Sequence, residues 1–196
     1  MTEKMLLLDG NSLINRAFYA MPPLTGPNGE FTNAVLGFFN IFFKLLADEK
    51  PDYIGVAFDL PQPTFRHEIF DGYKGSRKHM PDELRGQFPI LKNLLGLMDI
   101  KIYELAGYEA DDILGALSKK CENAGLYVSI VSGDRDLLQC ATDTVKIKIP
   151  KTKAGKTEVE TYNRVDFTEK FGVTPEQFIH VKALIDRKST RLNSSH

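Results

Sequence analysis

Short apolar runs that alternate with helical patterns are the feature of this sequence that most constrains its fold. Four such runs predict strands, at 4–8 (KMLLL), 53–58 (YIGVAF), 100–105 (IKIYEL) and 126–132 (LYVSIVS). They are apolar on both faces, which is typical of parallel strands covered by helices on both sides. The intervening segments with helical spacing are 12–20, 33–48, 83–98 and 109–124. This alternation predicts an α/β fold with a central, mostly parallel sheet.

Length and composition favour a single domain, or one domain with a small appendage. The chain has 196 residues, of which 42% are hydrophobic, and this is enough for one core. After the fourth strand, 150–160 reads as a polar hairpin or loop, and two short helices are expected near 163–171 and 175–184. The formal net charge is only −1, so any contact with nucleic acid must come from a local basic patch.

Targeting and redox features predict a cytoplasmic protein. The apolar run at the start of the sequence is too short for a signal peptide. The longest apolar stretch, 34–47, is interrupted by Asn40 and Lys44 and is shorter than the roughly 20 residues of a membrane span, so it is expected to be a core helix. Cys121 and Cys140 both fall in helical patterns and imply no disulfide framework, and reduced thiols fit the cytoplasm.

Acidic side chains follow all four predicted strands. Asp9 and Asp59 come at the ends of the first two strands, and the "YEADD" cluster follows the third. The complete set is Asp9, Asp59, Glu109, Asp111, Asp112, Asp134 and Asp136. Because ligands of open parallel sheets bind outside the carboxyl ends of the strands, we expect these acids to surround one cavity at one edge of the sheet.

Each acid taken alone has an ordinary structural explanation. A single acid at the end of a strand is more often a helix cap than a ligand, and acids in a first turn favour the helix dipole by about 0.3–1 kcal/mol each. Seven acids from four segments, however, do not all stay ionised without added positive charge. Oxygen ligands without a nearby Cys or His pair favour Mg²⁺ or Mn²⁺. More acids than one ion needs suggests two ions, the arrangement that cleaves phosphodiesters.

A basic and aromatic segment follows Asp59, at 64–85. Its basic residues are Arg66, Lys74, Arg77, Lys78 and Arg85, and Phe65, Phe70 and Tyr73 are interleaved with them. Positive charge with aromatic rings suits single-stranded nucleic acid, where charge follows the phosphates and rings stack on bases. The alternative is a solvated loop with ordinary surface lysines. Placed over the acidic edge, this segment would offset the repulsion between the acids and DNA.

Residues early in the chain have two interpretations each. Arg16 either reaches a phosphate or pairs with a carboxylate. Phe18 and Tyr19 offer a stacking surface, although core packing is expected for at least one of them. His67 and His79 are expected to be surface residues.

Four multi-residue motifs identify a family. They are LLLDGNSLINRAFYA, the pair VAFD and TFRHEIFDGYKGSR, then GYEADDILG, and finally SGDRDLLQ. In order and spacing they resemble the 5′-nuclease domains of bacterial DNA polymerase I and, more widely, the flap endonucleases, over about residues 4–184. The resemblance implies a PIN-like (resolvase-like) three-layer domain with a helical arch at about 64–92. It also implies removal of 5′ ends and flaps from DNA or RNA–DNA hybrids by a two-metal-ion mechanism, in primer removal during replication and repair.

The resemblance also implies roles for individual residues. The seven acids look like metal ligands, for two Mg²⁺ or Mn²⁺ ions in the complete domain, and Lys74 and Arg77 look like arch residues that contact the scissile phosphate. Contacts to nucleic acid are expected from Arg16, Phe18, Arg66, Tyr73, Lys78 and Arg85. The expected protein is a monomer whose parent chain continues into a DNA polymerase.

The sequence departs from the family pattern after "KAL" at 182–184. The family continues with Gly-Asp-x-Ser-Asp-Asn and a helix-hairpin-helix that grips duplex DNA, whereas here Arg187 and Thr190 stand at the two acid positions. Residues 1–185 are therefore expected to be an incomplete 5′-nuclease domain and 186–196 a non-native, disordered tail. With late acids missing from the second ion, we expect one competent cation site and strongly reduced activity.

Three rival functions keep some of these features. Phosphatases with a nucleophilic Asp at the first strand end usually carry a second acid two residues on, where this chain has Asn11, and they do not need the "YEADD" cluster. A PIN-type ribonuclease would keep the acids without the long arch. A non-catalytic DNA-binding fragment would need neither ion nor turnover.

Overall fold

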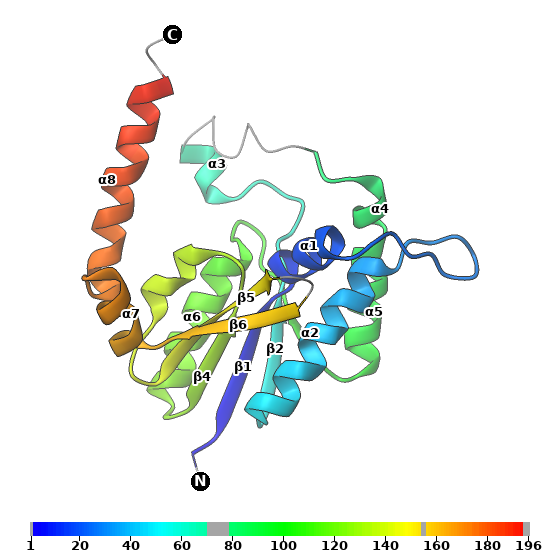
Figure 1. The fold of residues 1–196 in the computed structure, drawn as a ribbon, viewed down its shortest axis with the longest axis horizontal. Helices are drawn as coiled ribbons and strands as arrows, with labels where there is room; N and C mark the ends of the chain where they lie inside the picture. The colour runs from blue at the N-terminus through cyan, green and yellow to red at the C-terminus, as the bar shows by residue number, and fades with distance from the viewer. Residues whose placement is uncertain (1, 70–78, 154–155, 194–196) are drawn as a thin grey trace.

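A six-stranded, mostly parallel sheet organises the chain (Figure 1). The computed structural model describes residues 2–69, 79–153 and 156–193. The strands are β1 (Lys4–Asp9), β2 (Tyr53–Ala57), β3 (Lys101–Tyr103), β4 (Tyr127–Val131), β5 (Val145–Lys153) and β6 (Lys156–Tyr162), in the order β3-β2-β1-β4-β5-β6. The first five run parallel to one another, and β6 pairs antiparallel with β5. The predicted α/β fold with a mostly parallel sheet is confirmed.

Helices cover both faces of the sheet and make it the middle of three layers. On one face lie α1 (Gly10–Ala20), α2 (Asn33–Glu49), α4 (Asp82–Arg85) and α5 (Gln87–Leu97). On the other lie α6 (Ala110–Asn123), the 3-10 helix η1 (Arg135–Cys140), α7 (Arg164–Phe171) and the start of α8 (Pro175–Asn193). The short α3 (Phe65–Ile69) begins the segment that follows Asp59.

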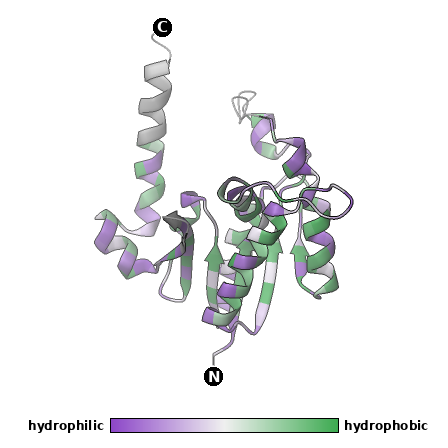
Figure 2. Cartoon of the chain, turned by 45° about the vertical axis from the view of Figure 1, so that its right-hand side comes forward, coloured by the Kyte–Doolittle hydropathy of each residue, from purple (hydrophilic) through white to green (hydrophobic). Residues whose placement is uncertain are grey.

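Alternation along β1 explains the two cores. Leu6 and Leu8 belong to the apolar cluster beneath α1, α2 and α5, whereas Met5 and Leu7 belong to the cluster beneath α6. Successive side chains of a strand point to opposite faces, so a strand in the middle of three layers must be apolar throughout. Figure 2 shows this pattern, with hydrophobic strands in the centre and hydrophilic residues on the outer helix faces.

The apolar stretch 34–47 is a core helix, as predicted. It forms most of α2, where Phe38 and Phe42 are fully buried and their rings stack with centroids 6.2 Å apart. Across the described part of the chain, no helix combines the length and hydrophobicity that crossing a bilayer requires.

The segment 150–160, predicted to be a polar hairpin or loop, belongs to the antiparallel hairpin of β5 and β6. Two other elements differ from the sequence prediction. The helix expected at 83–98 is divided at Gly86 into α4 and α5; Pro89 lies in the first turn of α5, where its missing N–H costs no intrahelical bond. The backbone of α8 is helical through Asn193, although disorder was predicted from residue 186. No glycine or proline follows Pro175 to stop that helix.

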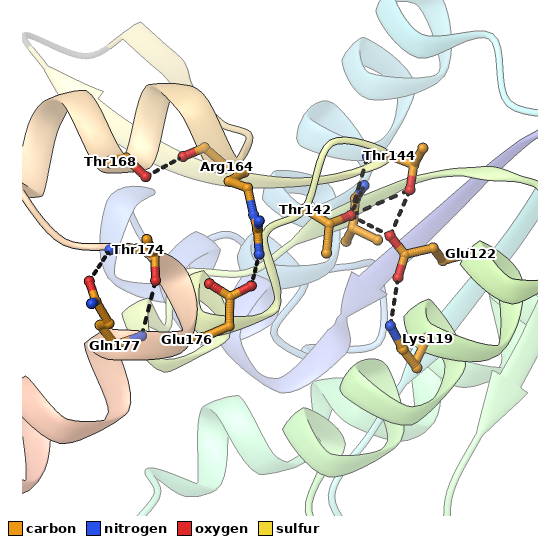
Figure 3. A network of polar contacts seen from close by, with 10 residues as sticks. Lys119, Glu122, Thr142, Thr144, Arg164, Thr168, Thr174, Glu176 and Gln177 are labelled. Atoms are coloured by element: carbon orange, nitrogen blue, oxygen red, sulfur yellow. Dashed lines mark hydrogen bonds and ion pairs between the residues drawn. The ribbon is translucent and has the colours of Figure 1, made fainter.

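Polar contacts fix the end of the fold that lies away from the carboxyl edge of the sheet (Figure 3). Glu122, near the C-terminus of α6, accepts hydrogen bonds from the hydroxyls of Thr142 and Thr144, and these bonds lower the pKa of its carboxyl. Arg164 of α7 pairs with Glu176 of α8. The first pair of contacts joins α6 to the turn that precedes β5, and the second joins α7 to α8.

Candidate metal centre

Asp9 lies at the centre of the carboxyl edge, where β1 passes into α1. It is only 4% exposed. As the N-cap of α1 it accepts a hydrogen bond from the Ser12 backbone N–H at 2.9 Å through Oδ1. Its Oδ2 accepts the Ser132 hydroxyl at 2.6 Å. The ordinary capping role is therefore real, but it leaves each oxygen with a further lone pair for another ligand.

Asp59 joins the end of β2 to the start of α6. Its Oδ1 accepts the backbone N–H of Ala110 at 2.7 Å, and its own N–H donates to Oδ1 of Asn11 at 3.0 Å. Asn11 stands where a phosphatase of the rival class would carry its second acid, and here its side-chain oxygen is used to hold the Asp59 backbone. The first turn of α6 is thereby brought beside the ends of β1 and β2.

One cavity of about 480 Å³ collects acids from all four segments. Five carboxylates line it: Asp9, Asp59, Glu109, Asp111 and Asp134. The prediction that strand-end acids share one edge of the sheet is confirmed for these five. They come from β1, β2, the start of α6 and the end of β4, because parallel strands deliver their carboxyl ends to the same edge.

Two of the five carboxylates, those of Asp9 and Asp111, have raised pKa values. Burial, together with the charges of Asp59 and Asp134, raises the pKa of Asp9 to about 6, against the lowering effect of its hydrogen bonds. Burial, followed by the charges of Asp9, Asp134, Asp59 and Glu109, raises the pKa of Asp111 to about 7. The site therefore concentrates negative charge where water does not fully screen it, and it gains from any added cation.

Asp112 and Asp136 do not line this cavity, in contrast to the sequence expectation. Both oxygens of Asp112 accept hydrogen bonds from Arg66, each at 2.7 Å, and its Oδ2 also accepts the Glu109 backbone N–H at 3.1 Å. Asp136 pairs with Lys182 of α8. Both carboxylates are thus neutralised by basic side chains from distant segments.

The carboxylates are splayed rather than closed around a point. Within residues 2–69, 79–153 and 156–193, no group of three or more His, Cys, Asp or Glu side chains is already arranged to enclose an ion. The donor set still fits a hard divalent cation, because the donors are carboxylate oxygens and the cavity of about 480 Å³ leaves room for the several waters that Mg²⁺ keeps.

The residues predicted to contact nucleic acid differ in burial and in whether they line the cavity. Phe18 packs against the α1–α2 core, whereas its neighbour Tyr19 is 72% exposed and lines the cavity. Core packing of at least one of the two rings was predicted, and Phe18 is that ring; its contact with nucleic acid stays a prediction. Arg16 is half-buried on α1 and does not line the cavity.

The described basic residues of the arch region are engaged in local contacts. Arg66 pairs with Asp112, as above, and its guanidinium lies over the Phe65 ring. Arg85 is exposed and donates to His79 at 2.9 Å. His79 is on the surface, as predicted, but it also lines the cavity. Lys74, Arg77, Tyr73 and Lys78 lie outside the described residues, so their roles stay predictions.

Comparison with known proteins decides the family. The model of the family described as "5′-3′ exonuclease, N-terminal resolvase-like domain" matches residues 4–172. The chain belongs to this family. DNA polymerase I of Bacillus caldotenax is 46% identical over 192 residues, and that of Bacillus subtilis is 48% identical over 194 residues. Each match covers 98% of this chain and 22% of the polymerase, so the chain spans about a fifth of the length of these relatives.

Solved structures share the fold of this exonuclease domain. The T5 D15 protein co-crystallised with metal ions superposes with a TM-score of 0.70 at 23% identity, covering 92% of this chain and 66% of that one. Human GEN1 in complex with Holliday junction DNA gives a TM-score of 0.57 at 14% identity, covering 90% and 42%. The predicted PIN-like, resolvase-like architecture is thus confirmed.

Sequence reasoning missed the uncharged lining of the exonuclease cavity. Asn11, Ser12 and Asn15 of α1 line it together with the acids. Asn11 and Asn15 are four residues apart and share a helix face, and the side-chain amide of Asn15 donates to the Asn11 carbonyl oxygen. Their position directly after a strand-end Asp was the available signal. Ser132, which is fully buried between β4 and Asp134, gave no signal in sequence.

Proposed function

We propose that this domain hydrolyses phosphodiester bonds at 5′ ends and 5′ flaps of DNA, and in RNA–DNA hybrids, with divalent cations as cofactors. The observation that carries the proposal is the convergence of five carboxylates from four strand-end segments on one cavity. The raised pKa values of Asp9 and Asp111 support it, since the ionised carboxylates of such a site repel one another unless cations are bound. Membership of the 5′-3′ exonuclease family supports the reaction class.

Mg²⁺ or Mn²⁺ would be held by Asp9, Asp59, Glu109, Asp111 and Asp134, directly or through water. When bound, such ions supply positive charge that stabilises the attacking and leaving oxygens of an in-line displacement. The protein contributes a fixed carboxylate frame, since Asp9 is held by Ser12 and Ser132 and Asp59 by Ala110. The amides of Asn11 and Asn15 offer donors to the substrate phosphate or its water.

We propose two ions in the complete domain. In this chain, the two ions have unequal numbers of carboxylate ligands. Four of the cavity acids lie at or before α6, whereas Asp134 is alone on the β4 side because Asp136 is paired with Lys182. The first ion therefore has the better ligand supply. A poorly held second ion would reduce turnover, in line with the substitutions at Arg187 and Thr190.

The substrate and the biological context belong to the same proposal. A flap endonuclease of bacteriophage T5 has been crystallised as a pseudo-enzyme-product complex with DNA and metal ions, and it shares this fold. Lys74 and Arg77 would contact the scissile phosphate, and Tyr73, Lys78 and Arg85 the neighbouring strand. We place the reaction in primer removal during replication and repair, in the cytoplasm, by a monomeric domain whose parent chain continues into a polymerase.

A cleavage assay with the 196-residue chain tests this function. A 5′-labelled flap duplex, a single-stranded RNA of the same sequence and a simple phosphomonoester are each incubated with excess protein and Mn²⁺. We expect cleavage near the flap junction that a chelator abolishes and that Asp59→Asn lowers by at least about 100-fold. Lys50→Ala, an exposed change at the far end of α2, is the matched control. Preferential RNA cleavage would indicate the PIN-type ribonuclease, and binding without metal-dependent cleavage the non-catalytic fragment.

A further inference from the structure

A buried hydroxyl connects two of the four segments that carry the cavity acids, the ends of β1 and β4. Ser132 follows the last residue of β4, and its side chain is completely inaccessible to solvent. Its hydroxyl donates to Oδ2 of Asp9 at 2.6 Å. The hydroxyl oxygen of Ser132 in turn accepts the backbone N–H of Asp134 at 2.9 Å. The Ser132 side chain therefore contacts both the carboxylate of Asp9, at the end of β1, and the backbone of Asp134, after the end of β4.

A second bridge runs beside the first. The hydroxyl of Ser12 accepts the Gly133 backbone N–H at 2.8 Å, and the Ser12 N–H donates to Oδ1 of Asp9. A Cβ at residue 133 would lie 2.8 Å from the Ser12 oxygen, so a glycine is needed for this close approach. The two serines thus join Asp9 and the 132–134 turn through four hydrogen bonds.

We propose that Ser132 is a positioning residue of the cation site: it sets the separation and orientation of Asp9 and Asp134 across neighbouring strands. This inference rests on the proposed metal-dependent function. A carboxylate held at one oxygen by a buried hydroxyl loses its freedom to rotate and still keeps a lone pair for a cation. Asp134 gains its place because its backbone N–H is fixed by the same oxygen. Ser132 itself is not among the residues that line this cavity.

The consequence of removing the hydroxyl follows from these contacts. Ser132→Ala leaves Asp9 with its Ser12 contact alone and leaves the Asp134 N–H without its acceptor. The side chains of Asp9 and Asp134 must then be ordered when the cation binds, and this ordering costs part of the binding free energy. Loss of a partner that orients a ligand typically weakens metal binding by about 10–100-fold.

Calorimetric titration of the 196-residue chain with Mn²⁺ tests this inference without relying on nuclease activity. We expect Ser132→Ala to weaken Mn²⁺ binding by about 10–100-fold, and Ser132→Thr, which keeps the hydroxyl, to restore binding to within about threefold of the unsubstituted chain. Ser118→Ala is the matched control. Ser118 is also buried, but its hydroxyl donates to the Gly115 carbonyl oxygen within α6, so Mn²⁺ binding should not change.

Each result has a distinct meaning. If the unsubstituted chain binds no Mn²⁺, the proposed metal-dependent function fails together with this inference. If it binds Mn²⁺ and Ser132→Ala binds equally well, only the role of Ser132 is refuted. If Ser132→Ala does not fold, Ser132→Cys keeps a similar side-chain size with a much weaker donor, and unchanged Mn²⁺ binding by that folded variant would refute the role of Ser132.

Discussion

The ion pair between Arg66 and Asp112 makes opposite predictions for two adjacent carboxylates. Asp111 lines the cavity among four other acids, whereas Asp112 is bound by Arg66 through two hydrogen bonds of 2.7 Å. We therefore expect Asp112→Asn to destabilise the metal-free chain at neutral pH and Asp111→Asn to stabilise it. The first substitution breaks an attractive pair, and the second removes one of several mutually repelling charges.

The size of the Asp112 effect follows from its surroundings. The side chains of Arg66 and Asp112 are 33% and 26% exposed. Exposed ion pairs contribute about 0–1 kcal/mol, and hydrogen bonds to charged groups about 1.5–3 kcal/mol. A bidentate pair at this intermediate exposure should have a coupling free energy of about 1–2 kcal/mol. Asp112→Asn alone should cost about 2 kcal/mol, because the helix dipole at the start of α6 also loses a negative charge.

A double-mutant cycle measures the coupling. The variants are Arg66→Met, Asp112→Asn and both together, unfolded by urea at pH 7 in the presence of a chelator. Arg66→Met keeps an apolar side chain of similar reach but removes the guanidinium, including its contact with the Phe65 ring. Mn²⁺ titrations of these variants and of Arg66→Met/Asp111→Asn test which acid is a cation ligand. We expect Asp111→Asn to lower Mn²⁺ affinity much more than Asp112→Asn does, both in the Arg66→Met background.

Two results would contradict this reasoning. A coupling free energy below about 0.3 kcal/mol, the range of additivity between independent sites, would mean that the ion pair does not anchor α3 to α6. Equal losses of Mn²⁺ affinity for Asp111→Asn and Asp112→Asn would restore Asp112 to the cation site.

Two further predictions concern titration and the aromatic pair. Because the pKa values of Asp9 and Asp111 are raised to about 6 and about 7, the folded metal-free chain retains protons that the unfolded chain has lost, so its free energy of unfolding should fall as pH rises from about 5 to about 7. Urea unfolding across this range should show the free energy of unfolding falling by at most about 1.4 kcal/mol per pH unit for each group. Saturating Mn²⁺ should abolish this pH dependence. A rise in stability from about pH 5 to about pH 7 would refute the prediction. Phe18→Ala should lower stability by about 1–3 kcal/mol through lost packing, whereas Tyr19→Ala should leave the melting temperature nearly unchanged and weaken flap binding. Equal losses of stability for the two variants would contradict the assignment of Tyr19 to the surface.

The layered fold and the position of the acidic edge were predictable from sequence. Runs such as 4–8 and 126–132 are apolar without alternation, and this pattern is physically required of strands that are buried on both faces. Once the strands are parallel, any residue that follows a strand lies at the same edge. Asp9, Asp59 and Asp134 were therefore placed by local pattern and one rule of sheet topology.

Helix ends in the C-terminal part were less predictable. The end of α8 depends on weak helix propensities with no glycine or proline to mark it, so 186–193 was predicted disordered and is helical.

The hairpin of β5 and β6 is an edge feature rich in lysine and threonine, and its pairing depends on the neighbouring β4 rather than on its own apolar pattern.

The sequence alone determined that acids gather at one edge of the sheet, but the tertiary structure decided which of them share the cavity. Successive residues of a helix are rotated by about 100°, so Asp111 and Asp112 cannot face the same point. Which of them turns inward depends on Arg66, 46 residues earlier in the chain and brought close only by folding. Ser132 contacts Asp9 across 123 residues for the same reason. Local sequence fixes the edge at which a side chain emerges, and only the packing of distant segments fixes its direction and its partner.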